Sequence, residues 1–568
     1  MAVRLANASE GVNRTLCVVF VCLLLVTSLS VPVVAVTAGS EPESVRNEVP
    51  TRQFHDHGGE SIEIGDGLES ADGTLEVVVR FEEATIPDSA TETGSEERLE
   101  DHADETQAPV LEYVDSTPGV SVETEFWVTN AVLLEVDTDR VALETFGEFP
   151  AVEAIHENFE LTVPEQPVVN TTDRSGPTSG VESETEIRAQ QPTRGVELLN
   201  APDVWEAYDT RGDGVRVAVL DTGIDADHPD LELATDDPSD PTYPGGWAAF
   251  DATGDRIEGS TPHDTGTHGT HVSGTVAGGA ATATQIGVAP DAELLHGLVL
   301  SDTSGSFAQV IAGVEWALEE DADVISMSLG SAGRHRQLID PVRNAVDSGT
   351  VVVAAVGNDG VETSDSPGNV YDSIGVGAVH ESGAVPSFSG GEWINRSDWQ
   401  SAPSSWPSSY VAPDVVAHGV GVVSTVPGGD YRAMPGTSMV TPHVSGAVAL
   451  MLSVEPDATP EEISTALYKT AWKPGQTGAP TNGPATDVRY GNGIVDAKAA
   501  TDSLVAAHSD IDPTTGGGAD ETSAMIPRAT PAFSGPVIVA VSIVVLAVSV
   551  GSLLTARSIA RETDNGDR

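Results

Sequence analysis

The chain has 568 residues, with 88 acidic and 26 basic side chains and a formal net charge of −62, so its surface repels nucleic acid and excludes that class of partner. A hydrophobic content of 39% excludes a wholly disordered acidic protein, and the length allows two or three folded domains. Because molar salt shortens the Debye length to about 3 Å and screens self-repulsion, the composition predicts a halophilic protein, with an archaeal source expected.

Residues 1–38 are expected to be a secretory signal peptide. Positive charge near the start precedes an apolar run over 16–36, and small residues at 35–38 offer a cleavage site. An uncleaved anchor stays open as an alternative, because the run is long for a signal core. Both cysteines, Cys17 and Cys22, fall in this run, so the processed chain would contain no disulfide.

Residues 39–163 are expected to form a small α+β domain with a β-α-β-β-α-β succession. An amphipathic helix is predicted over 137–149. Its strands are predicted from the apolar runs at 74–81, 126–129, 131–136 and 152–158. Residues 164–194 are rich in Pro, Thr, Ser and Glu, which is typical of a linker.

Residues 195–500 are expected to form an α/β domain. Near-continuous apolar strands at 324–330 and 351–356 alternate with helical runs at 307–318 and 340–347. Continuous apolar strands with helical crossovers predict a parallel sheet covered by helices on both faces. Ligands then lie at the carboxyl ends of the strands, where Asp221 and Asn358 are found.

Three side chains in this domain can supply nucleophilic catalysis. Asp221 ends a predicted strand, His268 begins a helix of small residues, and Ser438 lies where a loop becomes a helix. Unpaired N–H groups and the dipole at a helix start favour developing negative charge beside such a serine. An activated serine needs a base and an acid that orients the base, and His268 and Asp221 can fill these roles. A Gly-Thr-Ser triplet alone is more often a turn or a helix cap.

Four motifs in this domain give the chain a resemblance to the subtilases, the subtilisin-like serine proteases. They are Asp221-Thr222-Gly223, His268-Gly269-Thr270-His271-Val272, Ala354-Ala355-Val356-Gly357-Asn358-Asp359-Gly360 and Gly436-Thr437-Ser438-Met439. The order Asp, His, Ser is that of subtilisin and differs from chymotrypsin and the α/β-hydrolases. Two departures are Val440 and His418, which stand where the family usually has alanine and proline.

The resemblance implies a subtilisin-like fold and a serine endopeptidase that needs no cofactor for its chemistry and acts on protein or peptide substrates. It makes Asp221 the orienting acid, His268 the base, Ser438 the nucleophile and Asn358 an oxyanion-hole donor. Substrate-binding positions carried over from the family are Ser328, Leu329, Gly330 and Asp365. Asp365 falls at or beside the floor of the S1 pocket, and the alternative is a carboxylate that faces solvent. A non-catalytic binding or chaperone protein on the same scaffold is the competing hypothesis, which the complete set of motifs disfavours.

The resemblance also bears on metal binding and on the N-terminal domain. Asp230 matches a position that often binds calcium in the family, but the loop 280–286 is short and lacks asparagines. We therefore expect that site to be lost or altered, leave structural calcium open and assign no metal ligand. By position, the domain at 39–163 resembles the family's ferredoxin-like propeptide, an inhibitor removed by self-cleavage in the linker 164–194. An unrelated α+β substrate-binding domain is the alternative.

The C-terminal region predicts a membrane anchor. A polar linker at 501–535 precedes an uncharged apolar run at 536–556, which is long enough to cross a bilayer. Arg557 and Arg561 follow it, so the tail 557–568 is expected in the cytoplasm. The expectation is a single-pass protein of the cell membrane with its catalytic domain outside.

Overall fold

The computed structural model describes residues 51–53, 62–65, 67–68, 73–84, 92–167, 191–234, 246–475 and 486–509. The expected signal peptide, membrane helix and cytoplasmic tail, and most of both linkers, lie outside these residues. The chain divides into two units, Met1–Ala506 and Ala507–Arg568. Within the described ranges, one helical stretch is long and apolar enough to span a membrane, Thr437–Val454, and it is 89% buried in the protein core.

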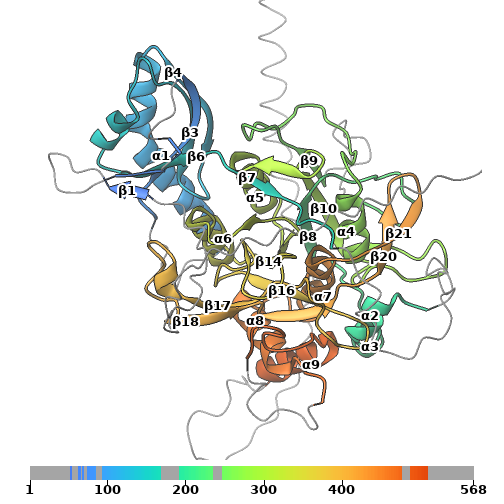
Figure 1. Ribbon diagram of the computed structural model, residues 1–568. Coiled ribbons are helices and arrows are strands. Elements are labelled where there is room, and N and C mark those ends of the chain that lie inside the picture. The colour runs from blue at the N-terminus through green and yellow to red at the C-terminus, as the bar shows by residue number, and fades with distance from the viewer. Residues whose placement is uncertain are drawn as a thin grey trace, which may run out of the picture. The chain divides into compact units, whose positions relative to one another are not determined.

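The centre of the first unit is a seven-stranded sheet in the order β19-β16-β14-β12-β8-β10-β9, with every neighbouring pair parallel. Figure 1 labels β8, β9, β10, β14 and β16 of this sheet. The strands are β8 (Arg216–Asp221), β9 (Trp247–Ala249), β10 (Glu293–Leu298), β12 (Val324–Met327), β14 (Val351–Ala355), β16 (Ile374–Val379) and β19 (Val415–His418). Almost all of their residues are buried, as expected for a parallel sheet covered on both faces. The predicted α/β class is confirmed.

Two apolar cores lie on opposite faces of this sheet. Val217 and Val219 of β8 belong to the core that includes helices α4 (His268–Ala277) and α7 (Val440–Val454). Ala218 and Leu220 belong to the core that includes α5 (Phe307–Glu319) and α6 (Ile339–Asp347). Alternation along one strand thus splits the helices into two layers. The predicted helices at 307–318 and 340–347 are confirmed. The other helices are α2 (Arg194–Leu198), α3 (Ala201–Tyr208), α8 (Pro460–Thr470) and α9 (Ala497–Ser509).

The described residues between 51 and 157 form a separate sheet in the order β1-β2-β6-β3-β5-β4, which we call the N-terminal module. Its elements are β1 (Thr51–Gln53), β2 (Glu63–Gly65), β3 (Thr74–Phe81), α1 (Glu92–Ser116), β4 (Val120–Phe126), β5 (Ala131–Asp137), the 3-10 helix η1 (Leu143–Glu148) and β6 (Val152–Glu157). From β3 to β6 the elements follow the expected β-α-β-β-α-β succession, and β6-β3-β5-β4 pair antiparallel.

Two local predictions for this module are wrong. The run 126–129 is the end of β4 followed by a turn, in which the Asn130 N–H bonds the Trp127 carbonyl and Asn130 has φ of 42°. The helix predicted over 137–149 is only the 3-10 helix η1. The 25-residue helix α1 has a polar, acidic sequence with Pro109 inside it, so its apolar periodicity is weak.

Four two-stranded sheets lie among the described residues besides the central sheet and the sheet of the N-terminal module. They are β7 (Glu160–Thr162) with β11 (Ser304–Ser306), β13 (Ser331–Ala332) with β15 (Asp365–Ser366), β17 (Glu392–Asn395) with β18 (Ser409–Ala412), and β20 (Val422–Val426) with β21 (Asp430–Met434). Three further 3-10 helices are η3 (Arg336–Leu338), η4 (Arg396–Asp398) and η5 (Thr437–Met439). The first pair matters for the site, because β7 follows the N-terminal module and β11 follows β10.

Candidate active site

Asp221 and His268 form a buried hydrogen-bonded pair. Asp221 is the last residue of β8 and is fully buried, and His268 is the first residue of α4. His268 Nδ1 lies 2.8 Å from Asp221 Oδ1 and 3.0 Å from Oδ2. Since a carboxylate accepts, the imidazole proton is assigned to Nδ1, which leaves Nε2 able to accept a proton. This is the geometry of a histidine base oriented by an acid.

The end of β8 and the start of α4 approach each other closely. The Thr222 hydroxyl accepts from the Gly269 N–H at 2.9 Å and donates to Asp264 Oδ1 at 2.8 Å. Gly223 has φ of +110°, and a Cβ there would lie 2.0 Å from the His263 carbonyl oxygen. A Cβ on Gly269 would lie 2.1 Å from the Gly223 carbonyl oxygen. The glycines of both sequence motifs therefore permit the contact that brings Asp221 to His268.

Ser438 lies in η5, directly before α7, and is 2% exposed. Its hydroxyl donates to the Ser328 carbonyl at 3.3 Å, and the Ser328 hydroxyl donates to the Ser438 carbonyl at 2.8 Å. His268 Nε2 is buried and has no hydrogen-bond partner in the described part of the chain. The structure thus joins acid to base, while the serine hydroxyl bonds the backbone directly after β12. Such catalytic contacts often tighten only when substrate binds.

Asn358 follows β14 and is oriented by Thr437. Its Oδ1 accepts from the Thr437 N–H at 2.9 Å and from the Thr437 hydroxyl at 3.0 Å. Because both donors occupy Oδ1, Nδ2 is free to donate, and it donates to the carbonyl oxygen of Glu165 at 3.1 Å. The orienting role of Thr437 was not predicted from the sequence, although it adjoins the predicted nucleophile.

Residues 160–166, which we call the active-site segment, lie along this site. Thr162 and Gly330 exchange two backbone hydrogen bonds of 2.8 and 2.9 Å, and the Val163 N–H donates to the Thr303 carbonyl at 2.9 Å. The segment also pairs through β7 with β11. It therefore lies as an extended segment between β11 and the backbone at Gly330, which is how peptides add to a sheet edge.

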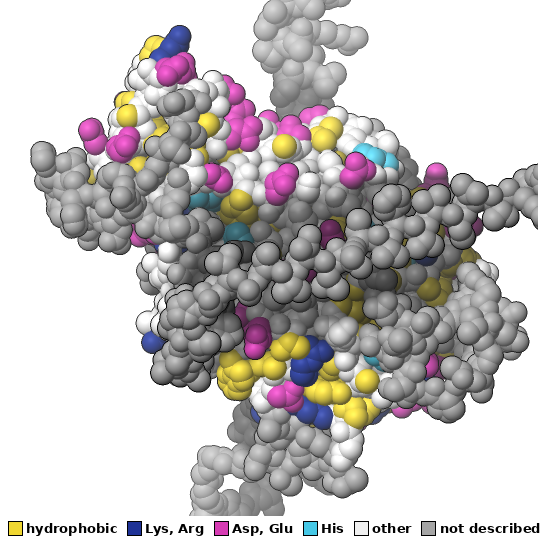
Figure 2. Space-filling model, in the orientation of Figure 1, with side chains coloured by type: hydrophobic (Ala, Val, Ile, Leu, Met, Phe, Trp, Pro, Cys, Tyr) yellow, Lys and Arg dark blue, Asp and Glu magenta, His cyan; other side chains and the backbone are white. Residues whose placement is uncertain are grey.

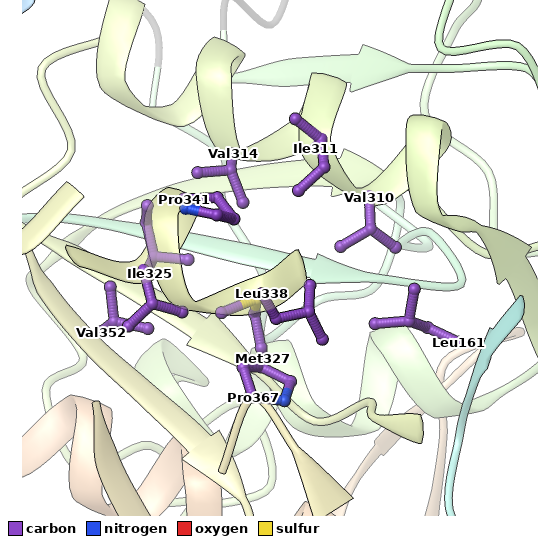
Figure 3. A pocket seen from close by; sticks show the side chains of 11 residues that line it. Leu161, Val310, Ile311, Val314, Ile325, Met327, Leu338, Pro341, Val352 and Pro367 are labelled. Carbon is purple, nitrogen blue, oxygen red and sulfur yellow. The ribbon is translucent and has the colours of Figure 1, made fainter. Parts of the chain in front are cut away.

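Leu161 fixes the active-site segment by its side chain. Figure 3 shows Leu161 at the rim of an apolar pocket, whose walls include Val310 of α5, Met327 of β12 and Leu338 of η3. Leu161 is fully buried, so its side chain is removed from water by residues far away in sequence. Burial of a leucine contributes about 2 kcal/mol to such an association.

The predicted substrate-binding residues lie around the active-site segment. Ser328 bonds Ser438, Leu329 is fully buried in the core beside α5, and Gly330 pairs with Thr162. Asp365 begins β15 and is 7% exposed, and its carboxylate lies against Gly357, where a Cβ would be 2.3 Å from Oδ2. The alternative of a solvent-facing Asp365 is therefore wrong. Burial, with Asp359 and Glu392 adding repulsion, raises the Asp365 pKa to about 7.

Asp230, the predicted remnant of a calcium site, is occupied by hydrogen-bond donors. Its carboxylate accepts from the Tyr431 hydroxyl at 2.7 Å and from the Ala281 N–H. Calcium needs six to eight oxygen atoms with free lone pairs directed at it. Across the described residues no cluster of three or more His, Cys, Asp or Glu is arranged to hold a metal ion. Both carboxylate oxygens of Asp230 therefore accept a hydrogen bond from the protein, which is consistent with the expectation of an altered site.

The parallel sheet, the Asp–His pair at its carboxyl edge and the serine at a helix start together define a serine peptidase. Residues 212–493 match the family model Peptidase_S8, described as the subtilase family. The chain is 38% identical over 317 residues to subtilisin E of Bacillus subtilis (strain 168), covering 55% of this chain and 72% of that protein. It is also 35% identical over 373 residues to the alkaline protease of Alkalihalobacillus alcalophilus, covering 64% of this chain and 85% of the relative. The chain belongs to the subtilase family and is a serine endopeptidase.

Proposed function

We propose that this protein is a secreted, membrane-anchored endopeptidase that works in high salt and cleaves peptide bonds through Asp221, His268 and Ser438. The observation that carries the proposal is the 2.8 Å contact between His268 Nδ1 and the buried Asp221 carboxylate, on the same edge of the sheet as Ser438. The similarity to subtilisin E and to alkaline proteases supports it.

The chemistry follows from the positions of these groups. Ser438 Oγ leaves the Ser328 carbonyl and attacks the substrate carbonyl, while His268 Nε2 takes its proton. His268 then passes that proton to the leaving amine, and water releases the acyl group by the reverse sequence. Asp221 stabilises the charged imidazole. Asn358 Nδ2 and the Ser438 N–H donate to the tetrahedral oxyanion, and one such donor is typically worth about 3 kcal/mol.

The N-terminal module would act as the protein's own inhibitor. The active-site segment, which follows the module along the chain, already bonds Gly330 and Thr303 like a substrate strand, and Asn358 contacts the Glu165 carbonyl. We therefore place self-cleavage at the Glu165–Gln166 bond, at the N-terminal end of the predicted range 164–194. The carbonyl of that bond is the one already held by the proposed oxyanion donor.

Asp365 would favour substrates with Arg or Lys before the cleaved bond. Its carboxylate is buried beside Gly357, next to Asn358, and Glu392 and Asp359 make the region more negative. A basic side chain reaching this carboxylate would form a charge-assisted hydrogen bond, whereas an acidic one would be repelled. Cleavage after Glu165 would therefore be slow compared with cleavage after Arg or Lys.

Export, anchoring and salt adaptation rest on the sequence. Figure 2 shows Asp and Glu side chains spread over the visible face, with few Lys and Arg among them. The apolar runs at 16–36 and 536–556 support export and a single membrane span, which would hold the catalytic domain outside the cell.

A fluorophosphonate probe tests the proposed nucleophile. We expect the mature protein to be labelled in molar salt, and labelling to be lost in Ser438→Ala and strongly reduced in His268→Ala. An unlabelled wild-type protein with its N-terminal module removed would instead support a non-catalytic binding protein.

A further inference from the structure

His296 is a buried polar residue in an otherwise apolar row. It lies on β10 opposite Val219 of β8 and is fully buried. Leu294 and Leu298, two residues away on either side, belong to the core that also contains Val272 of α4. Alternation along the strand therefore turns the imidazole of His296 toward α4. A polar group in such a place is costly unless its hydrogen-bonding atoms are satisfied.

Both nitrogens of His296 have partners. Nε2 lies 3.1 Å from the backbone nitrogen of Gly223, and Nδ1 lies 2.9 Å from Ser273 Oγ. A backbone N–H can only donate, so Nε2 must be the unprotonated nitrogen. The proton is then on Nδ1, which donates to the Ser273 hydroxyl. The ring of Trp247 stacks beside the imidazole, with the ring centres 6.1 Å apart and the planes 18° apart.

The imidazole of His296 is neutral at neutral pH. Burial lowers the His296 pKa to about 4, although Asp221 and Asp264 act in the opposite direction. Protonation of Nε2 would place a second hydrogen against the Gly223 N–H. His296 therefore stays in the tautomer with its proton on Nδ1, which satisfies both Gly223 and Ser273.

The two partners of His296 belong to the two elements that carry the acid and the base. Gly223 comes two residues after Asp221, and Ser273 comes five residues after His268 on the same helix. One rigid ring thus connects the loop after β8 to α4. We propose that His296 is a positioning residue that holds Asp221 and His268 in register, an inference that rests on their proposed catalytic roles.

Loss of the His296 bridge should lower kcat and leave KM unchanged. An apolar residue at position 296 leaves the buried Gly223 N–H without an acceptor and frees the loop from the helix. The Asp221–His268 geometry then loosens, and small misplacements of catalytic groups lower the rate of the chemical step. The residues that bond the active-site segment, Gly330, Thr303 and Asn358, make no hydrogen bond to His296. Substrate binding should be preserved.

The test compares His296→Leu, His296→Gln and Ser273→Ala in the mature enzyme in molar salt. In His296→Leu we expect kcat to fall about tenfold with KM within twofold, and the acid limb of the kcat–pH profile to move. Gln can present an oxygen near the position of Nε2, so His296→Gln should recover kcat to within about threefold of wild type. Ser273→Ala removes the other partner and should lower kcat with KM unchanged.

Leu294→Ala is the matched control, because Leu294 is buried on the same face of the same strand. It should lower the melting temperature and leave kcat and the pH profile unchanged. An equal loss of kcat in Leu294→Ala would overturn the proposal, as would unchanged kcat in His296→Leu or a parallel rise of KM. If His296→Leu does not fold, unchanged kcat in Ser273→Ala overturns it, and lowered kcat there with recovery in His296→Gln supports it. Ser438→Ala distinguishes failure of the proposed function from failure of the His296 proposal. Activity retained in Ser438→Ala would refute the catalytic triad, whatever the His296 variants show.

Discussion

The side-chain amide of Asn358 donates to the backbone carbonyl of Glu165 at 3.1 Å, although 193 residues separate the two along the chain. The proposed oxyanion donor is therefore occupied by the protein's own active-site segment. This contact joins the N-terminal module to the chemistry of the central sheet and leads to the first prediction.

The Glu165–Gln166 bond is expected to be cut by the enzyme itself. Ser438→Ala should accumulate as the longer precursor, because the nucleophile is missing while the segment stays bound. N-terminal sequencing of the mature wild-type protein should begin at Gln166. Maturation of Ser438→Ala to the same size in the absence of any other protease would contradict self-processing, and a different first residue would contradict this site.

Asp365→Gly should change the preference for the residue before the cleaved bond. The buried carboxylate would be lost, so a preference for Arg or Lys of about tenfold in kcat/KM should disappear. Self-cleavage after Glu165 should become faster, since the repulsion is removed. The measurement uses peptides that differ at that one position, and identical profiles for the two proteins would show that Asp365 does not contact the substrate.

Thr437→Val should lower kcat by about 3- to 10-fold, because the hydroxyl that holds Asn358 Oδ1 is removed while the Thr437 N–H remains. KM should change little, since the Thr437 hydroxyl donates to Asn358 and not to the active-site segment. Thr441→Val is the control: Thr441 is equally buried, and its hydroxyl donates only to the Thr437 carbonyl. Equal losses in the two variants would argue against orientation of Asn358.

Binding of the N-terminal module to the catalytic domain should depend on pH because of Glu315 of α5. Its carboxyl accepts from the Trp127 and Val128 N–H groups at 2.6 and 2.8 Å, and burial raises its pKa to about 8. Release of the module would expose this carboxyl group, and its pKa would return toward 4.5. A raised pKa in the bound state means that binding is strongest below the free pKa and weakens as pH rises toward 8.

Inhibition of the mature enzyme by the separately added N-terminal module measures this effect. The inhibition constant should rise by up to about tenfold per pH unit between pH 5 and 8 and then level off. Glu315→Gln keeps an acceptor for the two N–H groups and should give a flatter profile. A steep profile that survives in this variant would assign the pH dependence to another group.

Salt should control stability. With a net charge of −62, dilution from molar salt should restore long-range repulsion and unfold or inactivate the protein. Thermal unfolding and activity followed over a series of salt concentrations check this. An unchanged melting temperature and full activity at low salt would contradict it.

The sequence by itself determined the class of fold and the candidate catalytic set. Fully apolar strands such as Val351–Ala355 can be satisfied only in a sheet covered on both faces, and that property is local. The glycine-rich motifs around Asp221 and His268 can also be read from the sequence, because glycine leaves room for another segment of backbone to approach closely. The strand predicted at 126–129 was wrong because the prediction used only the apolar run. Asn130 adopts the left-handed conformation and ends a turn there, which the apolar run did not reveal.

Only the tertiary structure decided which distant residues meet at the site. The contact of Thr437 with Asn358 and the bridge of His296 between Gly223 and Ser273 depend on chain segments far apart in sequence. The burial of Asp365 depends on how the chain turns back after Asn358 to place its carboxylate against Gly357. No periodicity or spacing encodes such contacts, because they arise when elements from different parts of the chain pack at one edge of the sheet. The same holds for Glu165, whose place at Asn358 depends on the path of the chain after the N-terminal module.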